Sequence, residues 1–462
     1  MLGTAWAVFP AEGVRVGGKT LRFASYEARL RDLSEEKVDV DAVLETLDSR
    51  FSMQEDTLAF YREFFYENPD RIWLPDDDYT YFDTVFVAFE RARKEGKTVR
   101  VAHYGDSQIE LDRISQNLRE ALQVRFGGSG TGMFPALTTT PMASISHTAS
   151  GGFVSYTLVG DSTSRRAAHR RYGPLSQVVG FYGDGTVSLR AQKQKSTLEH
   201  VKTFESVSIL YGKASDDFTV TAQSDTLKPK ADVQEMDGVA WVTWHFGKPV
   251  EKASLKMSGS AEIYGVATDG EGGVTVDNVP MRGSTGHVLT RIDTTSLKAS
   301  FALDGTALVI LQFGGNFVPA AGSSKAISGY MDQVREQIAY FQRMAPSAKI
   351  LFIGPSDMAA STEDGRIVSY RRLPELVDSL KAVSLASGVA YWDLYSMMGG
   401  KNSMSQWVRH SPAYAGPDYV HFTPAGAKVV GETLSRSLLT YYDFYDLRKT
   451  LPADAVQQRM ER

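Results

Sequence analysis

Two stretches of this 462-residue chain alternate between short apolar runs and helix-period segments, and the long stretch between them shows strand patterns alone. Strands separated by helices are typical of a parallel sheet that is covered on both faces. Strands that follow one another through turns are typical of an antiparallel sandwich or jelly roll. The sequence therefore predicts an α/β domain that is interrupted by an all-β insert.

The α/β domain is expected to contain five short strands, among them the apolar runs at 307–313 and 349–354. The expected strands are 98–104, 273–281, 307–313, 349–354 and 390–394, and the expected helices are 108–126, 284–293, 329–344, 373–386 and 424–442. The insert is expected where period-two runs, such as Phe153–Val159 and Gly238–Phe246, are separated by turn residues.

The first 97 residues are mixed, with apolar residues at three- and four-residue intervals over 56–66 and 83–97 and a short hairpin around Gly17-Gly18. We expect a mainly helical extension that packs on the α/β domain. The predicted organisation is an extension at 1–97, a catalytic domain formed by 98–135 and 269–445, an insert at 136–268, and a tail at 446–462.

Composition and charge exclude several classes of function. With 50 Lys and Arg against 55 Asp and Glu, the net charge of −5 argues against a nucleic-acid partner bound by bulk charge. The absence of cysteine excludes disulfides, thiolate zinc sites and a cysteine nucleophile, and the eight histidines show no ligand spacing, so we expect no metal and no cofactor. No apolar run approaches the roughly 18 residues of a membrane-spanning helix. Met1–Pro10 is too short for a complete secretory signal, and we interpret it as the remainder of one, which favours a periplasmic or secreted protein.

Polar residues stand where the strands of the α/β domain end, and active sites of open α/β sheets form at that edge. Ser107 follows the first strand, Gly283 and Asn316 follow the second and third, and Asp418 and His421 precede the last helix. A hydroxyl, an imidazole beside a carboxylate, and N–H donors are the components of acyl transfer. The spacing of three predicts that Asp418 and His421 lie on one face of a helical turn, so that the carboxylate holds Nδ1 while Nε2 faces Ser107.

These residues lie in four blocks that resemble those of the SGNH (GDSL) hydrolase superfamily. The blocks are VAHYGDSQ (101–108), VPMRGSTG (279–286), LQFGGNF (311–317) and DYVHFT (418–423). The resemblance implies that Ser107 is the nucleophile, His421 the base and Asp418 its partner, and that Ser107, Gly283 and Asn316 form the oxyanion hole. It also implies a three-layer α/β/α (flavodoxin-like) fold on a five-stranded parallel sheet. The β insert is similar to that of bacterial peptidoglycan and polysaccharide O-acetylesterases, in which a carbohydrate-binding-like sandwich interrupts the catalytic domain.

Two positions depart from the family pattern. Gln108 stands where the family has leucine, and we expect this difference to have little effect. Phe317 follows Asn316 where the family often has aspartate, so another group must support that loop. Asp106 could act as a base, but a carboxylate in a turn more often bonds nearby backbone N–H groups, and we expect that role.

The set of residues predicts a serine esterase that removes O-acetyl groups from a carbohydrate polymer, either an acetylated polysaccharide or peptidoglycan. Two alternatives remain open: an O-acetyltransferase that uses the same triad with a sugar hydroxyl as acceptor, and a polysaccharide-binding protein without catalysis. Trp407 is a weak candidate for the wall of the substrate pocket. Trp241 and Trp244 in the insert could bind sugar rings, although core packing is the commoner role of such residues.

Overall fold

The computed structural model describes residues 57–137, 141–159, 166–194 and 197–453, the backbone of two short strands near the N-terminus, and the single positions Val456 and Met460. The two short strands, β1 (Val14–Val16) and β2 (Lys19–Leu21), pair antiparallel, which confirms the predicted hairpin. Met1–Pro10 lies outside the described residues. Within the described part of the chain, every helix is too short or too polar to cross a membrane.

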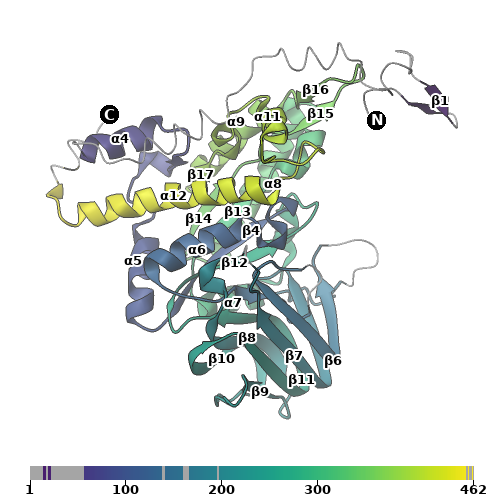
Figure 1. Ribbon diagram of the computed structural model, residues 1–462, viewed down its shortest axis with the longest axis vertical. Helices are drawn as coiled ribbons and strands as arrows, with labels where there is room; N and C mark the ends of the chain where they lie inside the picture. Colours follow the sequence, from purple (N-terminus) through teal and green to yellow (C-terminus); the bar gives the residue numbers. More distant parts are fainter. Residues whose placement is uncertain are drawn as a thin grey trace.

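A parallel sheet forms the centre of the molecule, and it contains all five predicted strands (Figure 1). Their order is β12 (Gly273–Pro280), β4 (Thr98–Gly105), β13 (Thr306–Gln312), β14 (Lys349–Ile353) and β17 (Ala390–Trp392). A sixth strand, β3 (Ile72–Trp73), comes from the N-terminal extension and pairs antiparallel with β17 at the sheet edge. The sequence did not predict β3, because a two-residue strand leaves no periodic pattern.

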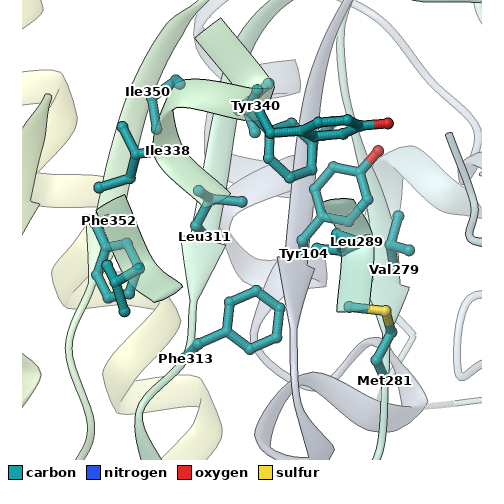
Figure 2. Close-up of a cluster of buried hydrophobic side chains, with 14 of the residues drawn as sticks. Tyr104, Val279, Met281, Leu289, Leu311, Phe313, Ile338, Tyr340, Ile350 and Phe352 are labelled. Atoms are coloured by element: carbon teal, nitrogen blue, oxygen red, sulfur yellow. The ribbon is translucent and has the colours of Figure 1, made fainter. Parts of the chain in front are cut away.

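Helices cover both faces of this sheet, as the predicted three-layer arrangement requires. One face packs against α5 (Asp83–Lys94), α6 (Ser115–Phe126) and α12 (Pro424–Arg448), with α4 (Thr57–Glu67) in the same apolar cluster. The other face packs against α7 (Thr294–Asp304), α8 (Ser324–Met344) and α9 (Leu373–Ala386). Because side chains alternate along a strand, Val101 of β4 joins the first cluster and Tyr104 joins the second. Figure 2 shows Tyr104 packed with Leu311, Tyr340 and their neighbours in the second cluster.

Short elements connect these layers. They are η1 (Pro75–Asp77), η2 (Ser107–Asp112), η3 (Glu199–Val201), η4 (His287–Arg291), η5 (Gly315–Ala320), α10 (Leu394–Met397), α11 (Ser403–Arg409), and the hairpin of β15 (Ala359–Ser361) and β16 (Ile367–Ser369). The helix predicted at 284–293 is wrong. Gly286 has a left-handed φ of 89°, which interrupts helical geometry, and Asp293 caps the true helix α7 by accepting a hydrogen bond from Ser296 N.

The described residues form a second, antiparallel sheet of seven strands, the first of which lies just before residue 136, the predicted start of the insert. They are β5 (Gly132–Phe134), β6 (Ile145–Thr157), β7 (Gln177–Ala191), β8 (Phe204–Ala214), β9 (Thr219–Gln223), β10 (Met236–Val250) and β11 (Lys252–Asp269). The strands of the expected sandwich are joined into one continuous hydrogen-bonded sheet. The 18-residue strand β11 joins them, because it pairs with β7 and β5 along one edge and with β9 and β8 along the other. This sheet has its own apolar core and lies at the far end of the molecule from α9 and α11 (Figure 1).

A buried charge cluster joins the insert to the parallel sheet. The guanidinium of Arg100, on β4, forms ion pairs with Asp269 at the end of β11 and, at 3.0 Å, with Asp277 on β12. All three side chains are almost completely inaccessible to solvent. The Arg100 guanidinium therefore ties the end of β11, the last strand of the insert, to β12, the next strand of the parallel sheet.

Candidate active site

The predicted nucleophile, base and acid meet at the carboxyl end of the parallel sheet. Ser107 is the first residue of η2, directly after β4. Its Oγ lies 2.8 Å from His421 Nε2, and His421 Nδ1 lies 2.7 Å from Asp418 Oδ2. Residues more than 300 positions apart thus form a continuous hydrogen-bonded chain from hydroxyl to imidazole to carboxylate.

The Asp418–His421 segment is a turn and not the helical turn that the spacing suggested. Ala415 and Phe422 form an antiparallel bridge, and Tyr419 between them has a left-handed φ of 57°. Asp418 Oδ1 accepts hydrogen bonds from the backbone N–H groups of Val420 and His421, at 3.0 and 3.1 Å. The carboxylate thus folds the loop with one oxygen and orients the imidazole with the other.

This arrangement favours the ionised form of Asp418. Partial burial acts to raise the pKa of its carboxyl, but the hydrogen bonds from the His421 ring and from the two backbone N–H groups outweigh burial and hold the pKa below its ordinary value. An ionised carboxylate is the form that can stabilise a positively charged imidazole.

The two further oxyanion donors predicted from the sequence line the same cavity as Ser107. Gly283 has a left-handed φ of 72°, and no atom lies within 4 Å of the place where a Cβ would stand. Backbone conformation, and not crowding, therefore requires glycine there. Within the described residues, no group accepts a hydrogen bond from the Gly283 N–H. Asn316 is more constrained, since its Nδ2 lies 2.9 Å from Asp106 Oδ2 and 3.1 Å from Ser284 O.

Asp106 supplies the loop support that the third block lacks. Its Oδ2 accepts from the Asn316 amide, and its Oδ1 accepts from the backbone N–H of Gln108, as expected for a carboxylate in a turn. Burial raises the pKa of Asp106 to about 6, and these hydrogen bonds oppose the rise. Asp106 therefore positions the nucleophile turn and Asn316 together.

Gln108 has a role that the sequence did not reveal. Its buried side chain donates from Nε2 to Val420 O at 2.6 Å and accepts at Oε1 from Phe422 N at 3.2 Å. These two backbone groups flank His421, so the residue after the nucleophile fixes the loop that carries the base. The expectation that this departure has little effect does not fit these contacts. Nothing local in the sequence signals a contact across 312 positions.

The triad opens into a cavity of about 590 Å³. Aromatic and apolar groups form part of its wall, namely Phe313, Pro319, Pro355, Met358, Tyr370 and Leu394. Trp407 is absent from the lining and is completely buried beneath the His421 loop, where its ring packs against Phe422 and Tyr414. The prediction that Trp407 forms the pocket wall is therefore wrong.

Charged side chains stand at the mouth of this cavity. The exposed Arg282 donates from Nε and Nη2 to the two oxygens of Glu110, at 2.7 and 2.5 Å. Arg113, half-buried, donates instead to two main-chain oxygens, those of Glu110 and Phe422.

The other residues singled out in the sequence lie away from the cavity. His103 is fully buried, bonded to Gln312 and Ser115, and burial lowers its pKa to about 4, so its imidazole is neutral at pH 7. Trp244 is in the core of the insert, and Trp241 lies with its ring 4.8 Å from the Arg100 guanidinium carbon. In the described part of the chain, no group of three or more His, Asp or Glu side chains is arranged to hold a metal ion.

No family model and no curated protein matches this chain. Among solved structures, a peptidoglycan O-acetylesterase matches over 77% of this chain and 95% of its own, at 20% identity and a TM-score of 0.61. An acetyl xylan esterase matches over 36% of this chain and 81% of its own, at 14% identity and a TM-score of 0.28. A family two carbohydrate esterase from Clostridium thermocellum, in complex with cellohexaose, matches over 62% of this chain and 98% of its own, at 11% identity and a TM-score of 0.27. The first match confirms, at the level of the fold, the predicted resemblance to O-acetylesterases.

Proposed function

We propose that this protein is a serine esterase that removes O-acetyl groups from a carbohydrate polymer. The observation that carries the proposal is the chain of contacts from Ser107 Oγ through His421 to Asp418, at 2.8 and 2.7 Å, on the wall of an open cavity. A hydroxyl in contact with an imidazole that is itself held by a carboxylate is the arrangement for general-base-assisted attack on a carbonyl carbon.

In the proposed reaction, Ser107 Oγ attacks the acetyl carbonyl carbon while His421 Nε2 takes the hydroxyl proton. The tetrahedral oxyanion accepts hydrogen bonds from the N–H groups of Ser107 and Gly283 and from the Asn316 amide. His421 then returns the proton to the departing sugar oxygen, which leaves an acetyl ester on Ser107. Water, activated by the same imidazole, releases acetate. Because Asn316 Nδ2 donates to two protein oxygens, those of Asp106 and Ser284, its donation to the oxyanion requires sharing or release of Ser284 O.

Two observations support a carbohydrate as the substrate. A cavity of about 590 Å³ falls within the range of pockets that bind drug-sized ligands, so it accommodates more than an acetyl group. A solved structure that shares the fold over 77% of this chain is a peptidoglycan O-acetylesterase. We also propose a periplasmic or secreted location, where acetylated cell-wall polymers are found.

Acetate release from a panel of acetylated glycans, including peptidoglycan and xylan, tests the proposal. The wild-type protein should release acetate from at least one member, and Ser107→Ala should release none while keeping the wild-type melting temperature. Ser379→Ala, which changes a serine on α9 bonded to Glu375 O, is the matched control and should keep full activity. Acetate release by Ser107→Ala would overturn the proposal.

The same assay separates the alternatives. With an oligosaccharide acceptor present, an O-acetyltransferase would produce acetylated acceptor in place of free acetate. A protein that only binds polysaccharide would retain the glycans and release no acetate.

A further inference from the structure

The guanidinium of Arg113 differs from the other cations near the active site, because no ion pair holds it. Arg119 is fully buried and donates to both oxygens of Asp112, at 2.6 and 2.9 Å. Arg282 is exposed and takes both oxygens of Glu110. Arg113 donates from Nε to Glu110 O at 2.9 Å and from Nη1 to Phe422 O at 3.2 Å, and within the described residues it has no carboxylate partner. Two of its five N–H groups are used, and both bind neutral oxygens.

This guanidinium is also partly removed from water. Arg113 is half-buried, and burial lowers the pKa of its guanidinium; the charge of Glu110 opposes this change, and the charge of Arg282 adds a smaller decrease. A desolvated cation without a partner is unfavourable, and an anion placed beside it relieves that cost. The carboxylate of Glu110 is already engaged by Arg282. The cavity therefore contains one cation whose charge the described part of the protein does not neutralise by direct contact.

The position of Arg113 links this charge to the reaction. Both oxygens that hold it belong to the catalytic segments, since Glu110 lies in η2 with Ser107 and Phe422 follows His421. Arg113 also lines the same cavity as Ser107, Gly283 and His421. A carboxylate on a sugar bound there could form a bidentate pair with the planar guanidinium, an arrangement that a neutral sugar cannot provide.

We propose that Arg113 binds a carboxylate of the substrate, so that the preferred substrate is an acetyl ester on an acidic saccharide. The inference rests on the proposed esterase function and adds the substrate class to it. The carboxylate could belong to the sugar ring, as in a uronic acid, or to an ether substituent, as in muramic acid. Both present the same group to Arg113.

Paired small substrates test this inference. The first pair is mono-O-acetylated methyl glucuronide and the corresponding methyl glucoside, and the second is 6-O-acetyl-N-acetylmuramic acid and 6-O-acetyl-N-acetylglucosamine. Hydrogen bonds to a charged partner predict that the wild-type kcat/KM is about tenfold or more higher for the acidic member of at least one pair. The preference should decrease as salt is added, because the charges are partly exposed. A preference in the first pair indicates a carboxylate on the sugar ring, and a preference in the second pair indicates a carboxylate on an ether substituent.

Substitution of Arg113 supplies the second readout. In Arg113→Gln the ratio of kcat/KM between the acidic and neutral members should fall to about one, and Arg113→Lys should retain part of it. Arg335→Gln, at a surface arginine of α8 paired with Asp332, should keep the wild-type ratio. If the Arg113 variants do not fold, the wild-type ratios still test the proposed acidic substrate class, and equal ratios would overturn it.

Hydrolysis of the neutral ester 4-nitrophenyl acetate shows whether the esterase proposal or only the inference about Arg113 is wrong. If the protein cleaves this ester but treats both members of each pair equally, or cleaves neither acidic member, the inference about Arg113 is wrong and the esterase proposal stands. If it cleaves neither this ester nor any sugar acetate, the proposed function itself is wrong.

Discussion

Replacing Gln108 with leucine, the residue usual at this position in the family that the sequence resembles, should lower kcat. The effect is expected although the Gln108 side chain hydrogen-bonds to none of the side chains of Ser107, His421 and Asp418. The variant loses the hydrogen bonds to Val420 O and Phe422 N, the two backbone groups that flank His421. Each buried hydrogen bond contributes about 1 kcal/mol, and an orphaned buried group costs about 1 to 3 kcal/mol. If about 2 kcal/mol of this lost stabilisation appears as a higher activation free energy, because the His421 loop is no longer held in place, kcat decreases about thirtyfold.

The assay is steady-state hydrolysis of 4-nitrophenyl acetate, together with urea unfolding of the same preparation. Gln108 is one of the residues that line the cavity, and the other residues of the wall are unchanged in the variant. A positioning role therefore predicts that kcat falls by a larger factor than KM changes. Gln123→Leu is the matched control. Gln123 is also buried, also donates to a backbone oxygen, that of Gly130 at 3.1 Å, and lies in α6 away from the cavity. It should lose stability without a change in kcat. Equal kcat values for wild type and Gln108→Leu would refute the reasoning.

Three further predictions concern charge. Asp418→Asn should lower kcat about a thousandfold or more with unchanged chromatographic behaviour, because the amide cannot stabilise a protonated imidazole; a loss below tenfold would contradict the role of Asp418. For Asp106, burial raises the pKa from 3.8 to about 6, so the native state binds more protons than the unfolded state between these values. The free energy of unfolding of the wild type, relative to Asp106→Asn, should therefore decrease by roughly 2 kcal/mol as the pH rises from 4 to 7, and a constant difference in urea unfolding would contradict this. Arg100→Met should destabilise the protein by about 3 to 5 kcal/mol, because it leaves two buried carboxylates unpaired, whereas Arg125→Met, at an exposed pair, should cost less than about 1 kcal/mol in the same thermal unfolding experiment.

The parts of the fold that repeat over several residues could be predicted from the sequence. Strands β13 and β14 are largely apolar runs, and α9 matches its predicted span at 373–386 because its apolar spacing is regular and Gly388 follows it. Elements set by single contacts could not be predicted. Strand β3 exists because Ile72 and Trp73 meet the edge of β17, and α7 begins where the Asp293 cap allows it.

The site shows the same division. That Ser107, Gly283, Asn316, Asp418 and His421 come together could be predicted because each stands in a short block at a strand end or before a helix. Their supports could not be identified, since those contacts join distant segments through one or two hydrogen bonds. Asp106 was expected to bond local N–H groups, which it does, but its contact with the Asn316 amide depends on how β4 and β13 lie side by side.

Trp407 shows why residue type alone misleads. A tryptophan in a loop beside catalytic residues can line a pocket or support the loop from below, and the two roles have the same local sequence. Here the Trp407 ring is buried and its Nε1 donates to Met398 O, so Trp407 supports the loop from below and does not line the pocket.

Covalent labelling of the proposed nucleophile tests the central claim most directly. The protein is treated with a fluorophosphonate, digested, and analysed by mass spectrometry, in parallel with a His421→Ala variant. We predict that the phosphonyl group is found on Ser107, that esterase activity is lost in proportion to labelling, and that His421→Ala is labelled far more slowly. Loss of activity with Ser107 unmodified, or labelling of Ser107 at the same rate in His421→Ala, would contradict it.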